Sequence, residues 1–412
     1  MTSSQTSNEN TYLLDPKAPL IIRSGRPFDE QAGADEARFP PPSTMAGALR
    51  AAYARANNIG FEGNTQCILS KAIKGPLPVK QSVSGDTHTL LVPKPADAQY
   101  YYNNQGEKEI VRLSPRPLVA DEGWDLPTSL LPVVFCEEQT KQHGKPESGP
   151  ERGKPVSGPE WWSFDDLLTW RVDKPLEYES ILRNGWTPPP GDIRTHVAIN
   201  FETYAAEDGK LFQTSGLPMW QAREQTKTVF PEERILLAGK IDGNIFPNNE
   251  SPTPIQALNL GGERRLAEIS TENTLWPDID SNTLSDLASA QYLSLTLLTP
   301  AIFENGWLPC NQGEDGRFIY SPPGSDNLQL ELISAAVGRW KAQSGWDLAN
   351  RRPKPSRKIA PAGSVYWFKV LAGDEHEIRQ LWLTNISTSK RDRTDGFGLV
   401  LPHSTKQLAS GA

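Results

Sequence analysis

The apolar residues of this chain fall into many short runs that are separated by Gly, Pro and polar residues. Runs of this length favour strands, as do runs in which apolar and polar residues alternate. They predict strands at residues 12–14, 20–22, 73–79, 89–92, 193–199, 210–213, 234–241, 293–297, 328–333 and 365–371. We expect the pair at 193–199 and 210–213 to form a hairpin.

Three segments show the spacing of a helix instead. After the proline run at 40–42, Met45, Leu49 and Ala52 recur on one helical face, and Ser43 is a suitable N-cap. A second helix is expected after Ser163, which is also a good cap, and a third near residues 375–383. Prolines number 36 among 412 residues, so we expect stiff, short connections and few long helices.

The chain is longer than one compact core usually is, so two domains are expected. Each half alternates strands with one or two helices, which favours an α+β fold over a parallel doubly wound sheet. A polar, proline-containing stretch at 274–289 separates the halves, and we place the domains at 11–280 and 285–405. The polar tail at 1–10 is expected to be disordered.

A low-complexity segment at 141–160 contains a tandem repeat. The copy at 144–151 reads GKPESGPE, and the copy at 153–160 reads GKPVSGPE. Such a sequence has little apolar surface to bury, so we expect a mobile surface loop without a function of its own.

The charge balance limits the kinds of partner. Fifty acidic residues against 42 basic ones give a net charge of −8, whereas a protein that coats nucleic acid by itself is usually basic. The balance permits a local basic site on an acidic body, or acidic faces that meet basic partners.

Several classes of site are excluded by what the sequence lacks. The three cysteines contain no CxxC pair, and none of the five histidines has a His or Cys at metal-ligand spacing, so we expect no metal, no cofactor and no disulfide framework. No catalytic motif is visible. No apolar run reaches 18 residues, so we expect a soluble, cytoplasmic protein without membrane contact.

The helix expected at Ser43 is the first candidate for binding an anion. The first N–H groups of a helix have no partner within it and carry the positive end of its dipole. Ser43, Gly47 and Arg50 share a face away from the apolar one, so a phosphate could approach over Gly47. The alternative is an ordinary capped helix with a solvated arginine.

Four further stretches are also candidates for binding phosphate groups. Arg194 and His196 lie on the first strand of the expected hairpin, where a packed histidine is the alternative. Glycines can bring the backbone close to a ligand, and guanidinium groups can pair with phosphates. The other three strings are LGGERR at 260–265, the basic stretch at 351–358 that leads into PAGSVY at 361–366, and GFG at 396–398. A surface turn or a solvated basic loop is the alternative for each.

The strings of this chain, taken in order, are similar to those of a known family. They are LDP at 14–16, RSGRPF at 23–28, FPPPSTMAGALR at 39–50, KGPL at 74–77, RTHVAIN at 194–200, LFQT at 211–214, LGGERR at 260–265, TPAIF at 299–303 with GW at 306–307, SGWDL at 344–348, PAGSVY at 361–366 and GFG at 396–398. From about residue 12 to residue 401 the chain resembles the Cmr subunit-three family of RAMP proteins, which belongs to type III-B CRISPR effectors in antiviral defence.

The resemblance implies a fold and a task. It implies two ferredoxin-like (RRM-like) domains with glycine-rich loops and long insertions. It also implies a non-catalytic subunit that binds the 5′ handle of the crRNA. The partners it implies are the large HD/cyclase-like effector subunit and a neighbouring RAMP backbone subunit.

The resemblance also extends to individual residues that would contact RNA or, in the second half, the large subunit. The residues implied are Arg23, Arg26, Ser43, Thr44, Gly47, Arg50, Arg194, His196, Gly261, Gly262, Arg264, Arg265, Lys354, Arg357, Gly363, Ser364, Gly396 and Gly398. Two alternatives remain. One is a metal-independent RAMP endoribonuclease that processes crRNA with His196 as base and Arg194 or Lys80 stabilising the phosphorane. The other is a purely protein–protein scaffold.

Overall fold

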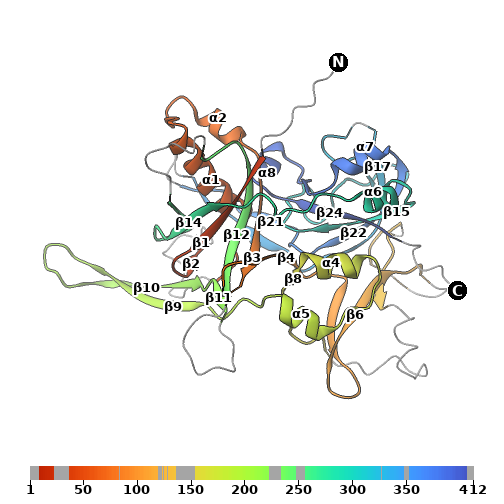
Figure 1. Cartoon of the computed structure of the whole chain (residues 1–412), viewed down its shortest axis with the longest axis horizontal. Coiled ribbons are helices and arrows are strands. Elements are labelled where there is room, and N and C mark those ends of the chain that lie inside the picture. Colours follow the sequence, from red (N-terminus) through yellow and green to blue (C-terminus); the bar gives the residue numbers. More distant parts are fainter. Residues whose placement is uncertain are drawn as a thin grey trace. The chain divides into compact units, whose positions relative to one another are not determined.

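The computed structural model describes residues 9–22, 37–82, 84–118, 123, 125–127, 129–135, 154–221, 233–246, 256–325, 327–347 and 352–405. The chain forms two compact units, each built from three segments. The first unit comprises Met1–His88, Pro188–Leu275 and Ala342–Lys358. The second comprises Thr89–Thr187, Trp276–Lys341 and Ile359–Ala412. Figure 1 shows the elements in sequence colours.

An antiparallel sheet forms the body of the first unit. The strands of this sheet that belong to the first unit are, in spatial order, β13 (Ala257–Asn259), β14 (Leu266–Thr271), β1 (Glu9–Pro16), β12 (Glu233–Asp242) and β3 (Ile73–Gln81), and β11 (Trp220–Gln221) also pairs with β12. The centre of this sheet is buried because β1 and β12 are apolar runs, and Leu13 pairs with Ala238. The fold is therefore built around the strand runs that the sequence predicted.

Helix α1 (Pro42–Ala56) packs on this sheet, and the short helix α2 (Thr65–Ser70) follows it. Met45 and Leu49 lie directly over Gly239 of β12, where an added Cβ would be 3.2 Å and 3.1 Å from their side-chain carbons. The prediction that Ser43 caps this helix is wrong, because the N-cap is Pro41. The helix has no side-chain capping hydrogen bond at this end. Pro42 takes the first helical position, which suits proline because its φ is already helical and the missing N–H would have no partner there.

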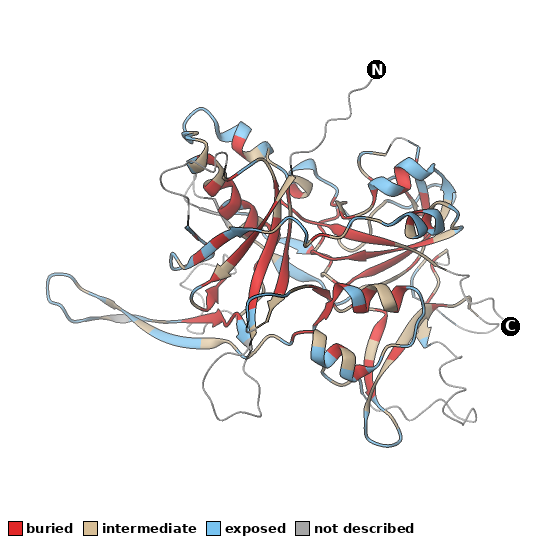
Figure 2. Ribbon diagram, in the orientation of Figure 1, coloured by how far each residue is buried: buried red, intermediate tan, exposed pale blue. Residues whose placement is uncertain are grey.

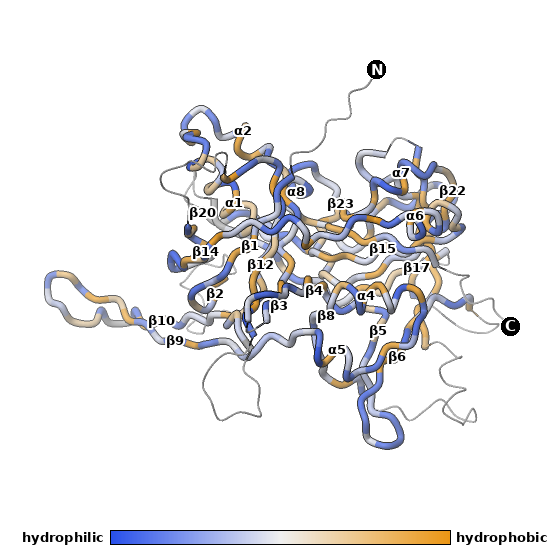
Figure 3. Tube along the Cα trace, in the orientation of Figure 1, coloured by the Kyte–Doolittle hydropathy of each residue, from blue (hydrophilic) through white to orange (hydrophobic). Residues whose placement is uncertain are grey.

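A long hairpin extends from the first unit (Figure 1). It consists of β9 (Asp192–Ile199) and β10 (Ala206–Leu217), and β2 (Leu20–Ile21) pairs with the base of β10. The predicted hairpin is confirmed, with β10 beginning earlier and ending later than the expected 210–213. Figure 2 shows that most of its length is exposed, although Figure 3 shows that many of its residues are apolar.

A second hairpin includes the basic stretch near residue 354. Strand β18 (Lys341–Gln343) pairs with β21 (Arg357–Ile359), and β19 (Trp346–Asp347) pairs with β20 (Arg352–Pro353). The basic stretch is thus one arm of a hairpin rather than an extended loop.

The second unit has a six-stranded sheet. Its order is β16 (Ile319–Tyr320), β17 (Gln329–Ala336), β22 (Val365–Ala372), β15 (Tyr292–Leu297), β24 (Leu399–Ser404) and β23 (Thr384–Asn385). Three short helices accompany it: α6 (Ser281–Ala288), α7 (Glu375–Gln380) and α8 (Lys390–Thr394). Alternate residues of β15, namely Leu293, Leu295 and Leu297, are completely buried in its core.

A smaller layer of the second unit is built from residues 88–187. Strand β4 (His88–Pro93) pairs with β8 (Trp161–Ser163), and β5 (Ala98–Tyr102), β6 (Lys108–Pro115) and β7 (Val133–Phe135) form a three-stranded sheet. Helices α4 (Phe164–Arg171) and α5 (Tyr178–Asn184) follow. The predicted cap at Ser163 is confirmed, because its hydroxyl accepts from the amide of Asp166 at 3.0 Å.

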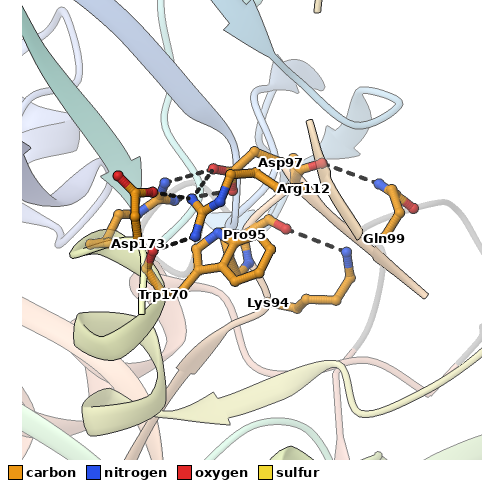
Figure 4. Close-up of polar contacts among 9 residues, drawn as sticks. Lys94, Pro95, Asp97, Gln99, Arg112, Trp170 and Asp173 are labelled. Carbon is orange, nitrogen blue, oxygen red and sulfur yellow. Dashed lines mark hydrogen bonds and ion pairs between the residues drawn. The ribbon is translucent and has the colours of Figure 1, made fainter. Parts of the chain in front are cut away.

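A buried charge cluster holds this layer together (Figure 4). Arg171 donates to both carboxylate oxygens of Asp97, at 2.7 Å and 3.2 Å, and Asp97 is 1% exposed. Arg112 lies 3.6 Å from the centre of the Trp170 ring and 3.4 Å from Asp173. Nearby, burial lowers the pKa of Lys94 to about 8, with Asp97 partly opposing it.

The structure describes one of the two copies of the tandem repeat. The first copy lies outside the described residues, but the second is packed against Tyr100. The amide of Val156 donates to the carbonyl of Tyr100 at 2.9 Å, and the Tyr100 hydroxyl donates to the carbonyl of Pro159 at 2.9 Å. The expectation of a mobile loop is therefore wrong for residues 154–160. Val156, which packs on the core, stands where the first copy has Glu147.

The α+β class is confirmed by these antiparallel sheets and their helices. The finer assignment to two ferredoxin-like domains, divided at 280–285, stays a prediction. The compact units interleave along the chain instead of following a single division. Residues 89–187 group with the later segments because they bond to them: the amide of Leu131, for example, donates to the carbonyl of Ile333 at 2.8 Å.

Candidate nucleic-acid interface

The glycine turn, defined here as residues 260–265, joins β13 to β14. The amide of Leu260 donates to the carbonyl of Arg265 at 2.8 Å, which closes the turn. Gly261 has φ +76°, and a Cβ there would lie 2.7 Å from the carbonyl oxygen of Ile21. Glycine is therefore required at this position for both its conformation and its close approach to β2.

Two further residues of the glycine turn, Glu263 and Arg264, are also left-handed, without being glycine. Glu263 has φ 54° and Arg264 has φ 51°, a conformation that costs non-glycine residues about 1–3 kcal/mol each. Arg264 is exposed, and Arg265 is half-buried. The guanidinium Nε of Arg265 is buried and has no hydrogen-bond partner among the residues that the structure describes. Strained backbone of this kind is concentrated at functional sites.

The glycine turn is bonded to the base of the long hairpin through β2. The amide of Gly262 donates to the carbonyl of Ile21 at 2.7 Å, and Ile21 pairs with Gly216 of β10. Residues 23–36 lie outside the described residues, so the predicted contacts of Arg23 and Arg26 do too. The residue that follows this gap, Ala37, lies at the same hairpin base, 2.8 Å from where a Cβ on Gly191 would be.

One face of the hairpin has an aromatic and polar character. His196 and Phe212 are cross-strand partners, and their rings stack at 5.2 Å with 18° between the planes. The Nε2 of His196 lies 2.9 Å from the hydroxyl of Thr214. Arg194, two residues earlier on the same face, donates to the Asp192 carboxylate at 2.7 Å and 2.9 Å, and half of its side chain is exposed.

The opposite face of the hairpin is aliphatic because side chains alternate along a strand. Its exposed members are Ile193, Val197, Ile199 and Leu211. At the tip, Phe201 is 87% and Tyr204 is 82% exposed. These two aromatic residues were not among the site residues predicted from the sequence. The available signal was the position of two rings in the short connection between two predicted strands.

Helix α1 contacts β13, the strand that leads into the glycine turn. Gly47 is exposed, and an added Cβ there would meet nothing within 4 Å, so the surface over it is open as predicted. Ser43 and Thr44 are half-buried in the first turn. Arg50 requires a correction: it is 4% exposed, and its guanidinium donates to the carbonyl of Lys71 at 2.9 Å and 3.0 Å. It therefore ties α1 to the chain after α2.

The second hairpin presents Lys354 and Arg357, which are both exposed. The carbonyl of Lys354 accepts from the Ser344 hydroxyl at 2.7 Å, and its amide donates to the carbonyl of Gly345 at 2.8 Å. These contacts fix the backbone of the arm while the lysine side chain stays at the surface.

The predicted contacts of Gly363 and Ser364 are not supported by their positions in the second unit. Both are buried. A Cβ on Gly363 would lie 2.4 Å from the carbonyl oxygen of Lys94, and its amide donates to the carbonyl of Leu297 at 2.7 Å. The hydroxyl of Ser364 donates to the carbonyl of Pro361 at 2.7 Å. These residues close a turn inside the protein.

Gly396 and Gly398 require the same correction. Both are buried, and their amides donate to the carbonyls of Arg393 and Pro300 at 3.1 Å and 2.8 Å. A Cβ on Gly398 would lie 2.7 Å from the amide nitrogen of Ser387. The glycines are needed for tight internal packing, and their N–H groups are not directed at a ligand.

The described residues contain no group of three or more His, Cys, Asp or Glu side chains that could hold a metal ion. His196, the base in the endoribonuclease hypothesis, contacts Phe212 and Thr214, and neither of these side chains is a second acid or base. Lys80, its suggested helper, pairs with Glu233 at 2.9 Å. No helix in the described part of the chain is long and apolar enough to cross a membrane.

The chain is similar to several solved structures at low identity. It shares 15% identity and a TM-score of 0.45 with a chain of the type III-B Cmr-beta complex bound to cognate target RNA and AMPPnP, covering 87% of this chain and 86% of that one. With a chain of the same complex bound to cognate target RNA, it shares 16% identity and a TM-score of 0.42, covering 87% of this chain and 86% of that one. With a chain of the Csm3–Csm4 subcomplex of the type III-A CRISPR-Cas interference complex, it shares 12% identity and a TM-score of 0.26, covering 89% of this chain and 94% of that one.

No curated protein matches the chain. The family model that matches is described as CRISPR-associated protein (Cas_Cmr3), and it aligns with residues 12–404. The match covers both compact units and every string on which the resemblance rested. The chain therefore belongs to the Cas_Cmr3 family of CRISPR-associated proteins.

Proposed function

We propose that this protein is the non-catalytic subunit of a type III-B effector that binds the 5′ handle of the crRNA, and that the first unit carries the RNA site. The observation that carries the proposal is the bond between Gly262 and Ile21. It joins a strained, arginine-bearing turn to the base of a hairpin with stacked rings, so groups that suit phosphates and groups that suit bases are linked within the first unit.

The chemistry of this surface suits single-stranded RNA. Arg264 and Arg194 supply guanidinium groups for phosphates, which provide most of the affinity in such complexes. The stacked pair of His196 and Phe212 offers a ring face for an unpaired base, and stacking of this kind is worth about 1–3 kcal/mol per base. The open surface over Gly47 lets a backbone pass close to α1.

The distribution of exposed candidates supports the first unit over the second. Among the described site residues that the resemblance implies, all those that are half-buried or exposed lie in the first unit. They range from Ser43 on α1 to Arg357 on the second hairpin. The implied residues of the second unit, Gly363, Ser364, Gly396 and Gly398, are buried. We therefore assign the second unit to protein contacts, with the large HD/cyclase-like subunit and a neighbouring RAMP subunit as the partners, in the cytoplasm.

A binding measurement tests the proposal. The double variant Arg264→Glu/Arg265→Glu should bind handle-containing crRNA at least about tenfold more weakly than the wild type. Arg379→Glu, an exposed arginine on α7 of the second unit, is the matched control and should change affinity less than about twofold. Affinity should also fall steeply with salt, since phosphate contacts release counterions.

The proposal fails if the wild type, alone and with its large subunit, prefers handle-containing crRNA no more than a scrambled RNA. It also fails if Arg379→Glu weakens binding as much as the double variant. A purely protein–protein scaffold predicts that the double variant assembles poorly and yet binds isolated RNA like the wild type.

A further inference from the structure

A groove in the second unit has a chemistry that differs from the RNA surface. It lies between the β5–β6 hairpin and the segment that enters α5, and it encloses about 840 Å³. Figure 1 shows these elements beside each other, with β6 in orange and α5 in yellow-green. All of its lining residues belong to the segment 102–182, so the groove is complete within this unit.

The walls of the groove are held in place by packing beneath them. Tyr178, at the start of α5, meets Tyr100 of β5 edge to face at 5.3 Å. Leu176 and Ile110 pack on the same core cluster. A groove whose floor is fixed by a core loses little conformational entropy when it binds a ligand.

Large apolar side chains of the groove are left in contact with solvent. Tyr102 at the end of β5 is 56% exposed, and Leu182 on α5 is 49% exposed. Aromatic and aliphatic side chains of this kind serve as anchors when a partner covers them.

The rim of the groove is negatively charged. Four glutamates line it, Glu107, Glu109, Glu177 and Glu179, against the single cation Lys108. The ammonium group of Lys108 is already engaged, because it donates to the carbonyl of Ser157 at 2.9 Å and lies 5.4 Å from the centre of the Tyr178 ring. The carboxylates would repel the phosphates of RNA and attract a cationic segment.

We propose that this groove docks a short segment of another protein in which a large apolar side chain is flanked by Lys or Arg. The apolar side chain covers Tyr102 and Leu182, and the basic residues pair with the glutamates of the rim. The inference does not depend on the RNA site, which lies in the first unit. The occupant is identified by the complementarity of charge and apolar surface.

Peptide selection tests the inference with the full-length protein. A library of random peptides of about twelve residues is selected on the immobilised wild type, and the affinities of the enriched peptides are measured by fluorescence anisotropy. We expect Lys and Arg around a large apolar residue. We expect Leu182→Asp to weaken binding about tenfold or more, and Glu107→Gln/Glu177→Gln/Glu179→Gln to weaken it several-fold and reduce its salt dependence.

The control is Leu371→Asp, at an exposed leucine of β22 outside the groove, which should bind like the wild type. If Leu182→Asp does not fold, as judged by its melting curve, Tyr102→Asp takes its place. The inference is overturned if no peptide is enriched, if the enriched peptides lack basic residues, or if they bind the Leu182→Asp protein equally well. Loss of crRNA affinity in a folded Leu182→Asp protein would show that the groove binds RNA, and this result would also overturn the inference.

Discussion

The amide of Gly262 donates to the carbonyl oxygen of Ile21 over 2.7 Å, so a turn late in the first unit is fastened to a strand near the start of the chain. Ile21 also pairs with Gly216 of the long hairpin. A change at the glycine turn should therefore reach the base of β10, and two surfaces more than 40 residues apart in sequence should respond together.

Gly261→Ala tests this fastening. The added Cβ would lie 2.7 Å from the Ile21 carbonyl oxygen at φ +76°, so we expect a loss of about 1–3 kcal/mol of stability and weaker crRNA binding. Chemical denaturation and an RNA titration measure both effects. Gly47→Ala is the control: it lies in a helix with open space around it and should stabilise the protein by up to about 1 kcal/mol. Equal stability changes in the two variants would contradict the structure.

Phe212→Ala and His196→Ala should each reduce RNA affinity by about 1–3 kcal/mol, because each removes one ring of the stack at 5.2 Å. Fluorescence anisotropy with labelled handle RNA gives the values. Leu211→Ala, on the aliphatic face of the same strand, is the comparison and should have a smaller effect. If Leu211→Ala costs as much, the RNA does not use the face that carries Arg194 and His196.

Asp97→Asn should be strongly destabilising, by about 3–5 kcal/mol, because it leaves the buried guanidinium of Arg171 without its charge partner. Asp173→Asn removes a carboxylate that is 58% exposed and 3.4 Å from Arg112, and it should cost no more than about 1 kcal/mol. Urea denaturation of the two variants distinguishes these values. A small effect at Asp97 would mean that its ion pair contributes little to the second unit.

Stability should also fall in mild acid because of His403 on β24. Burial, with the nearby charges of Arg171 and Arg112, lowers the pKa of His403 from 6.5 to about 4. As the pH falls, His403 is protonated in the unfolded chain before it is protonated in the folded protein. The contribution of His403 to the free energy of unfolding should therefore be constant above about pH 6.5 and decrease as the pH falls toward 4. His403→Gln should flatten this part of a plot of melting temperature against pH. An unchanged slope would show that other groups cause it.

Strand positions were predictable from the sequence because their side chains must alternate or stay apolar to be buried. The hairpin at 193–213 and the Ser163 cap rest on such local rules, and both are confirmed. The start of α1 was predicted one residue too late because both Pro42 and Ser43 suit the start of a helix. In the structure the helix begins at Pro42, and Ser43 lies within its first turn. Val156 was missed because an argument from composition treats the whole repeat alike, whereas this single apolar side chain packs on the core.

The glycine strings show why only part of the candidate site was predictable. The sequence, through its resemblance to the family, predicts Gly261, Gly363 and Gly398 as site residues, and all three have positive φ. It does not indicate what each one faces. Glycine is needed at these two positions because Lys94, far away in sequence, lies against Gly363, and Ser387, on a separate strand-to-helix segment, lies against Gly398. Arg50 is similar, since its partner is a backbone carbonyl that no side-chain pattern reveals.

The interleaving of the two units has a consequence for synthesis on the ribosome. The layer formed by residues 89–187 cannot reach its final partners until Ile333 and the strand Leu399–Ser404 have been made. The contact between Leu131 and Ile333 therefore forms only after more than 200 further residues have been translated, and incompletely folded segments of this kind bind chaperones. Division of the gene near codon 280 would separate the first unit from residues 342–358 and the second unit from residues 89–187. The two fragments should therefore fold only when they are produced together.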